Sequence, residues 1–271
     1  MSINQLYDVM VIGASEEGIN FCKQLLAKTT GVKIALISRN FNRPVEIEGI
    51  TKINQEVIFS SYNRGLIGLT LADRSQIFGI NVVIAVGTKP IKSNLKNCNI
   101  RYNLNDLKAS KTNPAVVVGN NTLAAMYALS MAKKFKYVYL CSNTVELECE
   151  SKYLKKLENT ANIVHLPNCN VIGCKNDKEG NLIEAQLDTY STIRCTTIVM
   201  SLGRTPDNSG LSKRMIDTDS EGYIVTKEFN QTTLIPNIYA IGTCTKNSTK
   251  PRLAAMLNHL IERNKFKTSE E

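Results

Sequence analysis

Apolar runs and amphipathic stretches alternate at the start of the chain. Residues 7–12 form an apolar run that stops at Gly13, which predicts a β-strand followed by a tight turn. The next stretch has helical spacing, and its apolar side chains fall near one face at Ile19, Cys22, Leu25 and Leu26. A second apolar run at 33–38 predicts another strand. This βαβ pattern, with a glycine turn after its first strand, is typical of a dinucleotide-binding fold.

The same pattern returns about 106 residues further along the chain. Residues 115–118 form an apolar run that leads to Gly119. A helix is predicted over 122–134, and 137–140 has the composition of the next strand. Two such units in one chain predict two domains of the nucleotide-binding type.

Further elements are predicted between and after these units. Short strands are indicated at 55–60, 68–72, 81–85, 163–166, 171–174, 183–187 and 198–201. Residues 175–181 have the composition of a hairpin turn, and the polar segments 103–114 and 204–221 are predicted to be connections. A last helix is predicted from Pro251. Its apolar face holds Leu253, Leu257, Leu260 and Ile261.

The composition is that of a folded globular chain. Of 271 residues, 43% are hydrophobic and 21% are charged, which excludes a disordered or collagen-like protein. No apolar run reaches the roughly 18 residues that span a bilayer, and the N-terminus lacks the pattern of a signal peptide. We therefore expect a cytoplasmic protein with no membrane partner.

The charge balance favours acidic partners. Lys and Arg number 33 against 24 Asp and Glu, which gives a formal net charge of +9. No zinc finger, aromatic RNA-binding signature or long basic tract is present, so nucleic acid is not predicted as a partner. An acidic protein and an anionic ligand both stay open.

The eight cysteines form no recognisable metal or redox motif. No pair has C-x-x-C spacing, and the closest two, Cys169 and Cys174, are separated by four residues. His165 and His259 are the only histidines, so no metal site is predicted. Most of the cysteines are predicted to be reduced and packed in the core.

The chain resembles the thioredoxin-reductase-like flavoproteins of the pyridine nucleotide-disulfide oxidoreductase superfamily. Five segments in the right order carry the resemblance, at 11–18, 82–90, 117–124, 198–208 and 219–242. The first and third stand where the family has its FAD-binding and NADPH-binding glycine turns, and the second is similar to its "ATG" strand.

The resemblance covers nearly the whole chain and implies an α/β fold. Two Rossmann-like three-layer domains, of the FAD- and NAD(P)-binding type, are expected, with the second inserted in the first. Residues 1–110 and 208–271 would form the discontinuous FAD-type domain, and residues 112–206 would form the NAD(P)-type domain. Family members are often homodimers, so a homodimer is implied as well.

The resemblance also implies which residues would hold the cofactors. FAD would be held through Gly13, Ser15, Gly18, Ser38, Gly87, Gly242 and Thr243. In the second domain, the residues at the corresponding cofactor-binding turn would be Gly119, Asn121 and Ala124. Arg39 would suit a 2′-phosphate, which NADP has and FAD lacks, so NADP stays open as a ligand of the first site. No catalytic residue is assigned.

Departures from the family pattern predict a weakened FAD site. Ser15 replaces the second glycine of the first turn, and Glu16 and Glu17 follow it at the helix start, where two carboxylates would repel a diphosphate. A helix start that satisfies itself without a ligand is the alternative. Ser38 follows the second strand, where an acid usually holds the ribose, and Thr243 replaces a carboxylate near the flavin.

The residues that carry out electron transfer in the family also differ in this chain. The family's C-x-x-C has no counterpart, and the chain between Asn40 and Ile58 is too short for the loop and helix that usually wrap the flavin ring. Residues 141–144 stand where NADPH-using relatives carry two arginines, so no cation is evident for a 2′-phosphate. The groove there is predicted to be neutral, lined by Asn120, Asn121, Ser142 and Asn143.

Two functions stay open. The first is a divergent thioredoxin-reductase-like, FAD-dependent oxidoreductase without its own redox dithiol. Its electron donor would not be NADPH in the usual mode, and an acidic ferredoxin-like protein would suit the positive charge. The second is a non-catalytic reductase-fold protein with degraded nucleotide sites, acting as a binding or scaffold partner.

Overall fold

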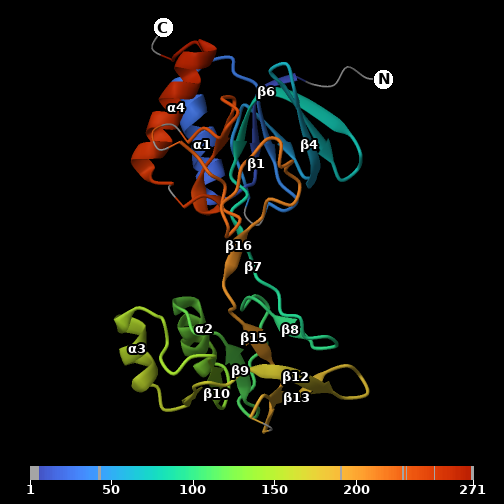
Figure 1. Ribbon diagram of the computed structural model, residues 1–271, viewed down its shortest axis with the longest axis vertical. Coiled ribbons are helices and arrows are strands. Elements are labelled where there is room, and N and C mark those ends of the chain that lie inside the picture. Colours follow the sequence, from blue (N-terminus) through green and yellow to red (C-terminus); the bar gives the residue numbers. More distant parts are fainter. Residues whose placement is uncertain are drawn as a thin grey trace. The chain divides into compact units, whose positions relative to one another are not determined.

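The structure, a computed structural model, describes residues 6–41, 44–189, 191–227, 229, 231–246 and 248–269. The chain divides into two units, Met1–Lys89 with Thr205–Glu271, and Pro90–Arg204 (Figure 1). The second unit is thus inserted within the first. Its first boundary lies about 20 residues before the expected one at 110–112, because the short strand β8 (Ile100–Arg101) pairs in the sheet of the second unit.

The first unit is built on a seven-stranded sheet in the order β3-β2-β1-β6-β5-β4, with β17 also paired to β6. The strands are β1 (Leu6–Ile12), β2 (Ile34–Ile37), β3 (Ile50–Ile53), β4 (Val57–Asn63), β5 (Leu66–Leu71), β6 (Gln76–Ile84) and β17 (Ile238–Ala240). β1, β2, β3, β6 and β17 run parallel, whereas β4 and β5 are antiparallel to their neighbours.

The sheet is therefore mixed, with both parallel and antiparallel strand pairs. The cause is the connection between β4 and β5. Arg64 and Gly65 form a two-residue turn with φ of 48° and 86°, and a hairpin this short joins only antiparallel strands.

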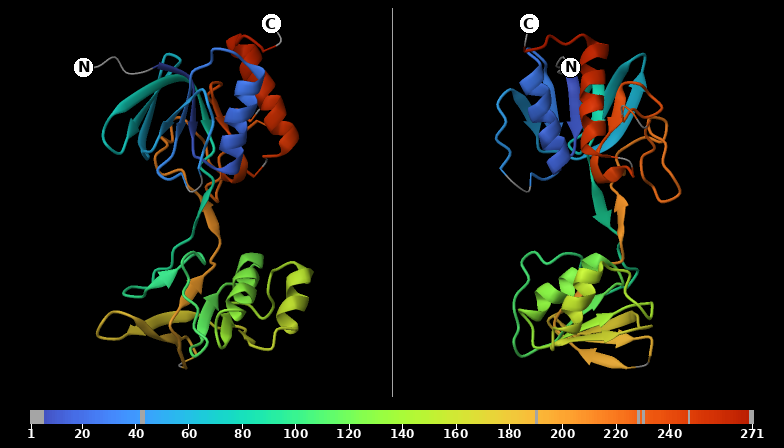
Figure 2. Two further views of the ribbon diagram at one scale, coloured as in Figure 1. Left: turned by 180° about the vertical axis from the view of Figure 1, so that it is seen from behind. Right: turned by 90° about the vertical axis from the view of Figure 1, so that its left-hand side faces the viewer.

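Two helices cover one face of this sheet. α1 (Glu16–Lys28) and α4 (Lys250–Asn264) lie side by side there (Figure 2). Their buried side chains, Phe21 and Leu25 of α1 with Leu257 and Leu260 of α4, pack in one cluster with β1 and β2. The apolar stripes expected for both helices thus face the core.

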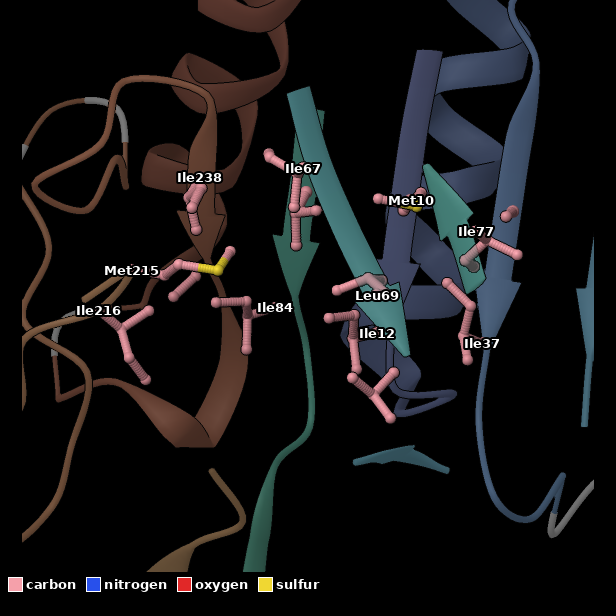
Figure 3. Packing of buried hydrophobic residues seen from close by; sticks show 14 of the residues in the cluster. Met10, Ile12, Ile37, Ile67, Leu69, Ile77, Ile84, Met215, Ile216 and Ile238 are labelled. Carbon is pink, nitrogen blue, oxygen red and sulfur yellow. The ribbon is translucent and has the colours of Figure 1, made fainter. Parts of the chain in front are cut away.

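The opposite face of the sheet has its own apolar core (Figure 3). Met10 and Ile84 point to this face from the central strands, and Leu69 joins them from β5. Met215 and Ile216 cover it from the irregular segment after the second unit. β1 contributes to both cores because successive residues of a strand point to opposite faces of the sheet. Met10 and Ile12 lie in this core, and Val9 and Val11 lie in the core under the helices.

The second unit has a parallel five-stranded sheet in the order β11-β10-β9-β15-β8 and a separate antiparallel sheet, β12-β13-β14. Its further strands are β9 (Ala115–Val118), β10 (Val138–Cys141), β11 (Ile163–Leu166), β12 (Val171–Asn176), β13 (Leu182–Leu187), β14 (Thr192–Arg194) and β15 (Ile198–Met200). Its helices are α2 (Thr122–Ala132) and α3 (Ser151–Glu158). The core around α2 and the core under β12 and β13 take alternate residues of β9, so the parallel sheet is the middle of three layers.

Two short strands, β7 (Thr88–Pro90) and β16 (Arg204–Pro206), pair where the chain passes between the units. Within the described part of the chain, no helix is long and apolar enough to cross a membrane.

Candidate functional site

The glycine turn after β1 keeps a tight backbone. Gly13 has φ of 105°, and a Cβ there would clash with the carbonyl of Ala85 at the end of β6. A Cβ on Gly18 would clash with the Gly13 carbonyl. The first and third glycines of the motif thus allow β1, β6 and α1 to approach closely, which is a requirement of packing with or without a ligand.

Ser15 occupies the position of the second glycine and caps α1. Its Oγ accepts a hydrogen bond from the Gly18 backbone N–H at 3.2 Å. Glu16 and Glu17 stand in the first turn, where their negative charges interact favourably with the helix dipole. The Gly18 N–H in the first turn of α1 is therefore satisfied by its own chain.

Glu17 also reaches the turn at the start of the 3₁₀ helix η1 (Gly242–Cys244). Its Cδ lies 3.3 Å from the position that a Cβ on Gly242 would take. The Gly242 backbone N–H donates to Ser248 Oγ at 2.8 Å. Because a carboxylate lies beside Gly242, an anion at this point would meet negative charge.

Arg39, at the end of β2, takes part in a cluster of charges. Its Nη2 lies 2.6 Å from Asp207 Oδ2 and its Nη1 lies 3.5 Å from Glu56 Oε1. Lys89 Nζ lies 2.8 Å from the other oxygen of Asp207. Burial alone would raise the pKa of Asp207, but the Lys89 hydrogen bond and the charges of Arg39 and Lys89 lower it overall. Arg39 is thus neutralised by carboxylates.

A pocket of about 100 Å³ lies at the carboxyl ends of β1, β2 and β6. Its lining includes Gly13, Ser38, Arg39, Val86 and Asp207. Ligand pockets of drug size are roughly 300–1,000 Å³, so this one is too small for a dinucleotide unless side chains move. Ser38 does not face it freely, because its Oγ donates to the Asn40 carbonyl at 2.8 Å.

Gly87 and Thr243 complete the carboxyl edge of the first sheet. Gly87 follows β6 with φ of 67°, and the position of a Cβ on it lies 3.6 Å from Thr243 Oγ1. The structure thus brings together all the predicted residues of the first site. It also adds Glu56, Lys89 and Asp207, which no local sequence signal indicated.

The second turn repeats the arrangement of the first. Gly119 has φ of 146°, and a Cβ there would clash with the Ser201 carbonyl. Asn121 stands at the second glycine of this motif and caps α2, since its Oδ1 accepts the Ala124 backbone N–H at 3.0 Å. The Asn121 amide also donates to the Ser201 carbonyl at 2.8 Å. Its polar atoms are used inside the protein.

The predicted neutral groove beside this turn is partly filled by the chain itself. Ser142 is fully buried, donates to the Thr144 carbonyl and lies 2.8 Å from His165 Nε2. Burial lowers the pKa of His165. The Glu148 backbone N–H donates to the Asn120 carbonyl at 2.7 Å, so the acidic segment after β10 lies against the start of α2.

The cysteines differ in one respect from the sequence prediction. Cys98 and Cys174, which are 76 residues apart, form a disulfide. The other six are free, and all but Cys149 are buried. Among the described residues, no group of three or more His, Cys, Asp or Glu side chains is placed to hold a metal.

At the first turn, the backbone conformation is compatible with FAD, whereas two side chains are unfavourable for its diphosphate. The tight turn at Gly13 and the close strand–helix packing at Gly18, both part of the dinucleotide-binding motif, are present. The Ser15 cap and the Glu17 carboxylate compete with a diphosphate at the same place. Both groups belong to small or flexible side chains that can move, so the residues present are compatible with FAD.

Comparisons with known proteins agree with this architecture. Thioredoxin reductase of Lactococcus lactis matches with a TM-score of 0.80 at 16% identity, over 96% of this chain and 98% of that one. Thioredoxin reductase of T. acidophilum matches with a TM-score of 0.75 at 19% identity, over 95% of this chain and 96% of that one. The bacillithiol disulfide reductase of Bacillus cereus has a TM-score of 0.75 at 16% identity, over 96% of this chain and 100% of that one. These likenesses show a shared fold.

Comparisons of the amino-acid sequence identify the family. The thioredoxin reductase of Borreliella burgdorferi is 24% identical over 198 residues, which are 69% of this chain and 60% of that protein's length. The model of the pyridine nucleotide-disulphide oxidoreductase family matches residues 45–257, well over half of the chain. The chain, with its two glycine turns on two Rossmann-like sheets, therefore belongs to the pyridine nucleotide-disulphide oxidoreductase family.

Proposed function

We propose that the chain is a divergent oxidoreductase of the thioredoxin-reductase type that binds FAD weakly and reversibly. One observation carries the proposal: Ser15 replaces the second glycine of the first turn, and its hydroxyl already accepts the Gly18 N–H. That glycine is the one that lets a pyrophosphate approach the backbone. A cap at this position competes with the diphosphate, which lowers the affinity while the glycine backbone keeps the site.

The residues that would hold FAD are those of the first carboxyl edge. Gly13 would form the tight turn and Gly18 the close strand–helix packing beside the diphosphate, and Gly87 with Thr243 would border the flavin side. Arg39 would have to leave Asp207 for the pocket to open. When bound, FAD would supply two-electron redox chemistry, which no side chain of this edge provides.

The proposed electron donor is an acidic protein, not NADPH in the usual mode. A groove between α2 and α3 supports this proposal. Lys133, Lys155 and Lys156 line it, its lining includes no Asp or Glu, and Met126, which is 42% exposed, contributes apolar surface. Charge complementarity of this kind steers association with an acidic partner.

Spectroscopy during FAD exchange tests the cofactor proposal. The full-length protein is mixed with excess FAD, its visible spectrum is recorded, and it is then dialysed. We expect a shifted flavin spectrum and quenched flavin fluorescence with FAD present, and loss of both on dialysis. A protein that shows no saturable change with millimolar FAD would overturn the proposal.

Salt-dependent binding of an acidic ferredoxin tests the donor proposal. The double variant Lys133→Glu with Lys155→Glu should weaken binding about tenfold or more at low ionic strength. Lys178→Glu, in an exposed turn of the same unit, is the control for a charge change away from the groove. Equal weakening by the control, or none by the double variant, would exclude the groove.

A second candidate is a non-catalytic binding protein with the reductase fold. The observation that favours it is the repetition of the same replacement at both turns, since Ser15 and Asn121 each cap a helix where the family has its second glycine. Failure of FAD binding in the exchange experiment would support this candidate.

A further inference from the structure

The second unit contains a disulfide that the dinucleotide sites do not use. Cys98 lies in the irregular segment 91–99 before β8, and Cys174 lies in β12. Both residues are partly exposed. An external thiolate must reach a sulfur to exchange with it, and partly exposed disulfides are the ones that react most readily.

The segment 91–99 keeps other anchors besides this bond. The Asn97 carbonyl accepts from Asn176 Nδ2 at 2.7 Å, and the Ser93 backbone N–H donates to the Tyr102 hydroxyl at 2.7 Å. Cys174 Sγ lies 3.5 Å from the Asn97 carbonyl oxygen, which is therefore placed to accept a hydrogen bond from a Cys174 thiol. Local structure on both sides of the bond is thus compatible with a reduced pair.

The remaining cysteines are less accessible to an external thiol. The side chains of Cys141 and Cys169 contact each other, but both residues are buried. Burial raises the pKa of Cys22 and Cys195 to about 12, which keeps these thiols protonated and inert. Cys149 is the one free cysteine that is partly exposed, and burial together with the nearby Glu150 raises its pKa. Cys98 and Cys174 are consequently the cysteines suited to exchange.

We propose that Cys98–Cys174 is a thiol–disulfide exchange site whose substrates are small thiols. A thiolate attacks Cys98 Sγ, the sulfur–sulfur bond breaks, and its electron pair passes to Cys174, which takes a proton from solvent. A second thiolate then attacks the sulfur of the thiol bound to Cys98, the bond between that sulfur and Cys98 Sγ breaks, and Cys98 Sγ keeps the electron pair and takes a proton from solvent. In total, two small thiols are oxidised to their disulfide and the protein disulfide is reduced to two thiols.

The site requires no flavin, so it goes beyond the proposed function and is tested separately. The full-length oxidised protein is equilibrated in buffers of reduced and oxidised dithiothreitol, quenched with acid, alkylated and mapped by mass spectrometry. We expect Cys98 and Cys174 to become labelled together under native conditions, about tenfold or more faster than buried Cys22, whose labelling needs local opening. After the reductant is removed, oxidised glutathione should restore the bond, with an unchanged circular dichroism spectrum throughout.

Glutathione in place of dithiothreitol reports the direction of attack. With oxidised glutathione, we expect the Cys174→Ala variant to form a mixed disulfide at Cys98 and release reduced glutathione, while Cys149→Ser leaves the response of the wild type unchanged. Two results would overturn the proposal. One is that the pair is reduced only in guanidinium, which makes the bond a structural link. The other is that Cys98 and Cys174 never join in oxidised glutathione. Both are read on the wild type, so they hold even if a variant fails to fold.

Discussion

At the residue scale, the glycines of the two turns are fixed by packing. Gly13 and Gly119 both have positive φ, and a Cβ on either would clash with a backbone carbonyl of a neighbouring strand or its end. Their presence is thus no proof of a bound nucleotide. It explains how the fold persists while the polar contacts of the sites change.

Substituting these glycines should destabilise the protein strongly. We expect Gly13→Ala and Gly119→Ala to lower the free energy of unfolding by about 2–4 kcal/mol, since each adds a backbone clash to an unfavourable φ. Gly31→Ala is the matched control, because Gly31 has φ of 75° but open space around it, and should cost only about 1–2 kcal/mol. Urea unfolding without ligand measures all three. Equal losses at the three positions would show that the carbonyl contacts do not matter.

Residues far apart in the sequence set the limit of prediction at this scale. The Ser15 cap could be anticipated, because a serine before two glutamates is a common helix start. The pairing of Arg39 with Asp207 joins residues 168 positions apart, and Cys98 pairs with Cys174 across 76. Nothing in the spacing of a single sequence indicates such contacts.

At the scale of elements, continuous apolar runs made most strands predictable. Buried strands such as β1, β2 and β9 and the helices α1, α2 and α4 lie where the pattern placed them. β3 was missed because its Ile-Thr-Lys-Ile sequence is only half-buried at the sheet edge. β8 was missed because it has only two residues.

The two helix caps should differ in their contribution to stability. Ser15→Ala removes one cap and should cost about 1 kcal/mol, whereas Ser15→Gly should cost only a few tenths. Asn121→Ala should cost about 2 kcal/mol or more, because it also leaves the buried Ser201 without its partners. Thermal unfolding of the full chain compares them. A loss for Asn121→Ala no larger than that for Ser15→Ala would contradict the added role.

At the scale of the whole molecule, both units retain the family's architecture while each nucleotide turn carries a side chain in place of its second glycine. Architecture depends on the apolar pattern, which the sequence displays plainly. Cofactor affinity depends on a few polar contacts, which the family resemblance alone does not determine. The fold could therefore be predicted with more detail than the chemistry.

The second unit should show no preference for NADPH over NADH. No Arg stands in the 141–144 segment, and the acidic Glu148 lies beside the turn. Thermal shift with each nucleotide measures this, because a ligand at 100 times its dissociation constant stabilises by about 2.7 kcal/mol. A much larger shift with NADPH would contradict the expectation. If Arg39→Gln then abolished that shift, the first site would be the binder.

The affinity for FAD tests the central claim, that the capped and acidic first turn weakens a retained site. The measurement is the FAD dissociation constant of the wild type and of the triple variant Ser15→Gly, Glu16→Pro, Glu17→Ala. The variant should bind FAD about tenfold or more tightly, because two carboxylates no longer repel the diphosphate at the helix start and the cap no longer competes with it. Glu46→Ala with Glu48→Ala, two exposed positions, makes the same charge change as a control. A wild-type protein that keeps one FAD per chain through dialysis, or a triple variant with unchanged affinity, would contradict the account.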